Sequence, residues 1–137
     1  MTEHQPYNER LNHPHDFEVY YHILTELEGG RKTLPLQGIR WDFCYGHDGK
    51  HKENQLWMIW PEFLDETGNV ITQKTEPVPS SGKARMWIVS DASRKYHQDK
   101  IKIGMEANGH EGGTVVAKYR VSKIVGLMTN PIKEIDK

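Results

Sequence analysis

Basic side chains at two places in this 137-residue sequence could bind an anionic ligand. A basic loop follows the pair Gly29-Gly30, and further cations alternate along a later segment. Arg and Lys bind phosphate, while a neighbouring hydroxyl fixes the position of the bound strand. The alternative is that these residues only solvate a loop and the outward side of a strand. The candidate RNA contacts are Arg31, Lys32, Thr33, Arg40, Lys118 and Arg120.

Histidines and one cysteine are the other reactive groups. His47, Asp48 and His51 offer two imidazoles and a carboxylate close together, but a zinc site needs three or four converging ligands, so we expect exposed histidines and no metal. His13 and His15 flank a proline, and this pair indicates a metal site no more strongly than His47, Asp48 and His51 do. Cys44 has no neighbouring base that would lower its thiol pKa. The sequence therefore predicts no catalytic residue, no enzyme and no cofactor.

Tryptophans indicate a possible contact with another protein. Trp41 shares the parity of inward residues and is expected in the core, whereas Trp57 and Trp60 have opposite parities, and Trp87 alternates with apolar neighbours. At least one of them should therefore point away from the core, because only one side of a barrel is interior. An exposed tryptophan commonly anchors an interface, unless residues 1–16 or another subunit cover it. The candidate interface residues are Trp57, Trp60 and Trp87.

Strands must position all of these groups, because apolar and polar residues alternate with a period of two through most of the chain. Pro61 is expected to limit the third segment. Residues 90–99 form the one stretch that favours a helical turn, and residues 108–113 are expected to turn. The pattern predicts an all-β fold, a single antiparallel β-barrel, closed or partly closed, of about six strands. The alternating segments are residues 17–27, 39–45, 55–60, 82–89, 101–105 and 115–125.

Length and composition predict one domain, with a flexible N-terminal arm over residues 1–16, the barrel over 17–126 and a tail over 127–137. The formal net charge of -1 provides no global attraction to nucleic acid or membranes, so any RNA site must be a local patch. A single cysteine and the lack of a long apolar segment favour a cytoplasmic protein without a membrane span.

Two motifs resemble the start of the C-terminal, third β-barrel domain of elongation factor Tu-like translation factors. Residues 29–35 match its Gly-Gly-Arg-x-Thr-Pro loop, with Leu34 inserted, and residues 38–43 match Gly-Tyr-Arg-Pro-x-Phe, with Trp41 in place of Pro. Residues 104–121 are similar to its closing strands, although an Arg is absent there. The resemblance covers residues 17–125 and implies a Greek-key barrel, here expected to stand alone.

The same resemblance implies a function. In these factors the Gly-Gly-Arg loop lies against the transfer RNA backbone, and Arg31, Lys32 and Thr33 match it. A phosphate-binding Gly-x-x-x-x-Gly-Lys-Ser/Thr loop is absent from the sequence, so no nucleotide cofactor is expected. We predict a non-catalytic binding module that contacts tRNA-like phosphates. The alternative is a protein-interaction or neutralising partner module, or a homodimer, that uses an exposed tryptophan face and has no RNA role.

Overall fold

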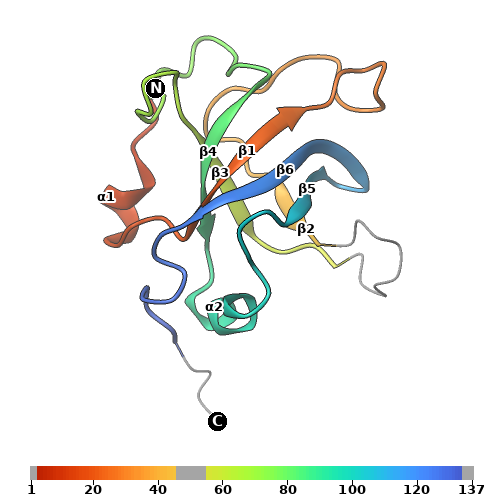
Figure 1. Cartoon of the computed structure of the whole chain (residues 1–137). Coiled ribbons are helices and arrows are strands. Elements are labelled where there is room, and N and C mark those ends of the chain that lie inside the picture. Colours follow the sequence, from red (N-terminus) through yellow and green to blue (C-terminus); the bar gives the residue numbers. More distant parts are fainter. Residues whose placement is uncertain (1–2, 46–54, 134–137) are drawn as a thin grey trace.

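In the part of the chain that the structure describes, six antiparallel strands form one curled sheet, a half-barrel, with two short helices beside it (Figure 1). A computed structural model of the chain describes residues 3–45 and 55–133. The strand order is β2-β5-β6-β1-β4-β3, and every pairing between neighbours is antiparallel. The all-β, antiparallel prediction is confirmed. The elements are α1 (Tyr7–Leu11), β1 (Phe17–Ile23), β2 (Asp42–Cys44), β3 (Ile59–Phe63), β4 (Ser81–Ile88), α2 (Asp91–Gln98), β5 (Glu106–Glu111) and β6 (Thr114–Ile124).

The core fills the concave side of the sheet. In β1, Phe17 and Val19 are wholly buried and Tyr20 points outward, as the alternation predicts. Trp41 is buried, which confirms its expected place in the core. Aromatic rings meet edge to face there, for example Phe17 and Phe43 with ring centroids 5.9 Å apart.

Four strands differ from the expected bounds by more than one residue: β1 and β2 are shorter than the expected segments 17–27 and 39–45, and β3 and β5 are shifted toward the C-terminus. β3 continues through Pro61, which lies opposite Met86, and this is tolerated because β3 is the last strand of the order and needs no second partner there. β5 covers residues 106–111 in place of the expected 101–105. Gly109 permits this strand, since a Cβ at that position would lie 2.6 Å from the Tyr119 hydroxyl oxygen.

The two ends of the strand order meet at one point. Phe43 in β2 and Trp57, just before β3, exchange both backbone hydrogen bonds, with N to O distances of 2.9 and 2.8 Å. The Gln37 side chain also donates to the Phe63 carbonyl and accepts from its amide, both at 2.9 Å. Part of the edge of β3 is therefore covered.

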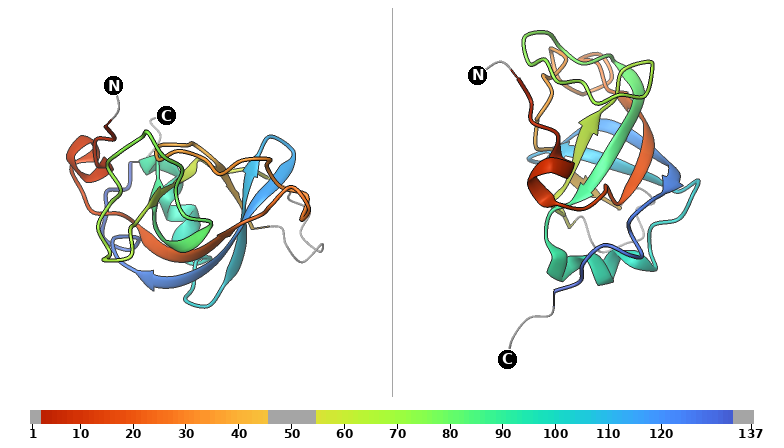
Figure 2. Two further views of the ribbon diagram at one scale, coloured as in Figure 1. Left: turned by 90° about the horizontal axis from the view of Figure 1, so that it is seen from above. Right: turned by 90° about the vertical axis from the view of Figure 1, so that its left-hand side faces the viewer.

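The segment before β1 is packed against the sheet, where the sequence predicted a flexible arm. We call residues 3–16 the N-terminal segment; it contains α1, which lies beside β3 and β4 (Figure 2). Glu62 of β3 holds it: the buried carboxylate accepts hydrogen bonds from His4 Nε2 at 2.6 Å and from the Tyr7 amide at 2.9 Å. The buried Glu62 carboxylate thus holds the N-terminal segment in place, although the sequence of that segment shows no regular spacing of apolar residues.

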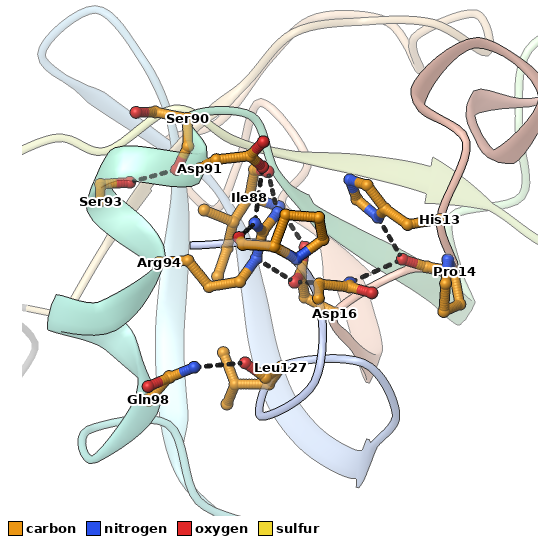
Figure 3. Close-up of polar contacts among 12 residues, drawn as sticks. His13, Pro14, Asp16, Ile88, Ser90, Asp91, Ser93, Arg94, Gln98 and Leu127 are labelled. Atoms are coloured by element: carbon orange, nitrogen blue, oxygen red, sulfur yellow. Dashed lines mark hydrogen bonds and ion pairs between the residues drawn. The ribbon is translucent and has the colours of Figure 1, made fainter. Parts of the chain in front are cut away.

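A buried guanidinium in α2 joins the segment that leads into β1 to the segment that follows β6 (Figure 3). Arg94 is fully buried; its Nε donates to Asp16 Oδ1 at 2.7 Å and its Nη1 donates to the Pro131 carbonyl. Asn130 donates to the Pro14 carbonyl at 2.8 Å. The helical turn expected in residues 90–99 is present as α2. The described part of the expected tail, residues 127–133, is fastened to the domain through these contacts.

Candidate nucleic-acid interface

The convex side of the sheet carries rows of outward side chains from neighbouring strands. Residues that pair directly across antiparallel strands project on the same side. Tyr20 of β1 lies between Lys83 of β4 and Arg120 of β6, and Lys118 follows in the next row opposite His22. We call Tyr20, Lys83, Lys118 and Arg120 the cationic face. The strand register, and not sequence proximity, brings them together.

The cationic face is open to solvent. Tyr20 is 47% exposed, with Lys83 Nζ 5.7 Å and Arg120 Cζ 5.8 Å from its ring centroid. Within residues 3–45 and 55–133, no ion pair engages Lys83, Lys118 or Arg120. An open hollow of about 410 Å³ adjoins Tyr20, Lys118 and Arg120. Positive charge is therefore available to an anion here.

Acidic neighbours of the cationic face are mostly held by other groups. Glu28 accepts a hydrogen bond from the Thr25 amide and lies 3.2 Å from His22 Nε2; the backbone bond, followed by His22, lowers the carboxyl pKa. Glu18 is paired with His15 at 2.8 Å. Glu106 stands directly opposite Arg120. It is the acid that competes most directly for a guanidinium on this face.

The Gly-Gly-Arg loop lies at the end of β1, next to β6. The Leu24 amide donates to the Val116 carbonyl at 2.8 Å, which fixes the start of the loop beside the strand that carries Lys118. A Cβ at Gly30 would lie 2.3 Å from the Leu24 carbonyl oxygen, so the turn requires glycine there. The loop is thus placed next to the cationic face.

The predicted RNA-contacting residues in and after that loop are not equally free to bind a ligand. Arg31 is engaged: its Nε lies 3.1 Å from Glu111 Oε2, and its Nη1 donates to the Thr33 carbonyl at 3.2 Å. Lys32 and Thr33 are exposed. Arg40 lies elsewhere, with its guanidinium 4.7 Å from the Trp60 ring centroid. The structure therefore brings Lys118 and Arg120 together, sets Lys32 and Thr33 at the end of β1, and separates Arg40.

The tryptophans do not form the expected exposed face. Trp87 points outward but is 0% exposed, because Tyr7, His13 and His15 cover its ring at centroid distances of 5.9, 5.8 and 6.0 Å. Its Nε1 donates to Glu62 Oε1 at 2.9 Å. The N-terminal segment therefore covers Trp87, which is the alternative that the sequence left open for an outward tryptophan.

The other two tryptophans are half-buried. Trp60 packs near Tyr7 with ring centroids 6.5 Å apart, and Trp57 stacks on Tyr96 at 4.7 Å. Trp57 also contacts His97 edge to face at 4.6 Å. The three tryptophans do not share one surface, because Trp57 packs against the core and α2.

Other candidate chemistry is sparse. No cluster of metal-binding side chains occurs within the described residues, and the expected grouping of His47, Asp48 and His51 lies outside them. Cys44 is buried. No helix in the described ranges has the length and apolar character needed to cross a membrane.

Sequence reasoning missed Tyr20 and Lys83 as members of the site. Both have outward parity in their strands, which the sequence shows, but only the register places Lys83 opposite Tyr20. No protein-family model matches the chain, and no curated protein matches it either. A function for this protein therefore rests on its own surface chemistry.

Proposed function

We propose that this protein is a non-catalytic RNA-binding module that holds RNA phosphates on the cationic face, with Lys32 and Thr33 at one end of it. One observation carries the proposal: Lys83, Lys118 and Arg120 come from three neighbouring strands, are exposed, and make no ion pair with any described residue.

Charge at this density suits a polyanion. Arg forms paired hydrogen bonds with phosphate and Lys acts as a mobile point charge, so the two together hold a backbone without selecting its sequence. The net charge of -1 means that attraction acts locally, within about a Debye length of 8 Å at physiological salt. We therefore expect modest, strongly salt-dependent affinity.

The resemblance to elongation factor Tu-like barrels supports the same proposal. The Gly-Gly-Arg-Lys-Thr loop that carries the resemblance lies beside β6, which bears Lys118 and Arg120. A closed Greek-key barrel of that type is part of the proposal. Its support is the paired hydrogen bonding between Phe43 and Trp57, which joins the two ends of the strand order.

The test is the salt dependence of transfer RNA binding. Lys118→Ala with Arg120→Ala should weaken binding of fluorescein-labelled transfer RNA, measured by fluorescence anisotropy, and should flatten the plot of log affinity against log salt by about 1.4 to 1.8, because two phosphate contacts are lost. Lys95→Ala with Lys102→Ala removes two exposed charges elsewhere and serves as the control. Absent or salt-independent binding by the parent protein would refute the proposal.

A protein partner is the second candidate, favoured by the Arg40 and Trp60 pair. Arg and Trp are the residues most often found at the energetic centre of interfaces, and here a guanidinium already stacks 4.7 Å from a half-buried indole. A complex of defined stoichiometry that survives ribonuclease and is lost with Trp60→Ala would favour this candidate. A homodimer is one form of it, and sedimentation analysis would identify it.

A further inference from the structure

We infer that the cationic face takes single-stranded RNA, with one unpaired base stacked on the Tyr20 ring and the flanking phosphates held by the surrounding cations. This inference rests on the proposed RNA-binding function and adds the class of RNA. A duplex keeps its bases stacked inside the helix, so only an unpaired base is free to reach an aromatic side chain.

The Tyr20 ring is available for stacking. It is 47% exposed, and Lys83 Nζ and Arg120 Cζ lie over the ring at 5.7 and 5.8 Å from its centroid, near the outer limit of about 6 Å for a cation–π contact. Tyr96 provides the contrast: it is 40% exposed, but Lys100 Nζ lies 3.9 Å from its centroid and Trp57 stacks on it. Tyr96 is therefore closely covered, whereas the cations above Tyr20 stand farther from its exposed ring.

The cations are placed where the phosphates of such a nucleotide would lie. Lys83 and Arg120 pair directly with Tyr20 on either side, one strand spacing away, about 4.7 to 4.9 Å. Lys118 is two residues from Arg120, on the same side of β6. A base on Tyr20 thus has long basic side chains on both sides of its ribose, which combines a stacking platform with backbone neutralisation.

The hollow beside Tyr20 gives the base room. It is lined by β1, β5 and β6, including His22, Asn108, Lys118 and Arg120 together with the acidic Glu106. Glu106 stands opposite Arg120 and weakens its hold on phosphate without removing it, so the strand should run along Lys83, Tyr20 and Lys118 with Arg120 beside it. Stacking tolerates every base, so little sequence preference is expected.

The experiment compares two labelled probes, a 12-nucleotide oligouridine and a 12-base-pair RNA duplex, at one salt concentration. Tyr20→Leu removes the ring but keeps an apolar side chain on the strand, and Tyr20→Phe is the matched control that keeps the ring. Tyr20→Leu should weaken oligouridine binding on the order of 10-fold to 100-fold and leave duplex binding unchanged. Tyr20→Phe should bind oligouridine within about twofold of the parent, because stacking needs only the aromatic face.

The outcomes separate this inference from the function on which it rests. If Tyr20→Leu binds oligouridine as well as Tyr20→Phe does, or loses equal affinity for the duplex, stacking is refuted, while a loss with Lys118→Ala and Arg120→Ala would still support RNA binding. If the parent protein binds neither probe, both proposals fall. Urea unfolding of each variant checks that the outward substitution leaves the fold intact.

Discussion

At the scale of single residues, His97 of α2 is a buried base without positive charge at neutral pH. Its Nδ1 lies 2.6 Å from the Tyr45 hydroxyl oxygen, and its ring stacks near that phenol. Burial, followed by the positive charges of Lys100 and Arg94, lowers the His97 pKa from 6.5 to about 4. The imidazole therefore works as a neutral packing and hydrogen-bonding group.

The lowered His97 pKa predicts acid sensitivity. The unfolded chain takes up this proton near pH 6.5 and the folded chain only near pH 4, so stability is complete above pH 6.5 and declines as the pH falls toward 4, by on the order of 3 kcal/mol. In urea titrations at several pH values, His97→Gln should reduce the slope of stability against pH in this window. His15, whose pKa is also lowered by burial, supplies a smaller slope of the same sign.

Asn8→Gln is the control for the His97 measurement, because this position is exposed and neither side chain is ionisable. It should leave the slope of the parent protein unchanged. A His97→Gln protein that keeps the full slope between pH 4 and 6.5 would show that the acid sensitivity originates elsewhere.

At the scale of elements, the N-terminal segment depends on one carboxylate. Glu62 is wholly buried and accepts from His4, from the Tyr7 amide and from Trp87 Nε1. Three donors on two separate elements thus converge on a single side chain. Removing the carboxylate leaves them without a partner, which costs more than the hydrogen bonds themselves contribute.

Glu62→Leu is expected to release the N-terminal segment from β3 and β4. The free energy of unfolding should fall by about 3 kcal/mol, because buried donors are left unpaired. Acrylamide quenching of tryptophan fluorescence should increase as Trp87 is uncovered. Glu62→Gln, which keeps one acceptor oxygen, should lie between the parent and Glu62→Leu, and Glu66→Leu in the exposed turn should resemble the parent. Unchanged quenching in Glu62→Leu would contradict this account.

Features that depend on local sequence were predictable, whereas features that depend on distant contacts were not. Alternation predicted β1, β4 and β6, because a two-residue period is a local property that survives in a half-buried strand. It did not predict the packed N-terminal segment, which is fixed by contacts with Glu62 across 58 positions of sequence. β5 lies later in the chain than the expected segment 101–105, because Gly109, which the sequence assigns to a turn, fits under Tyr119 within a strand.

The same distinction applies to the residues of the cationic face. Lys118 and Arg120 were found because their spacing of two is visible in one segment. Tyr20 and Lys83 were not, because their adjacency depends on the pairing of β1 with β4. The alternation pattern also does not show that the N-terminal segment packs over Trp87.

At the scale of the whole molecule, the convex side has two halves. The half near the start of β1 is closed by the N-terminal segment over Trp87, and the half around Tyr20 is open. The segment that leads into β1 and the segment that follows β6 meet at the closed half, where Arg94 binds Asp16 and the Pro131 carbonyl. Since β1 and β6 are neighbours with Phe17 opposite Ile124, the first and last strands of the chain lie side by side.

That adjacency determines how the domain responds to mechanical force. Tension between the two ends enters β1 at Phe17 and leaves β6 at Ile124, which are opposite each other, so the strand hydrogen bonds are loaded one after another. Once the Arg94 contacts yield, the sheet should peel open at low force. Tension between the N-terminus and a handle at position 113 loads the same bonds together in shear, and optical-tweezer traces should show a higher rupture force. Equal forces in the two geometries would mean that another part of the domain sets its mechanical strength.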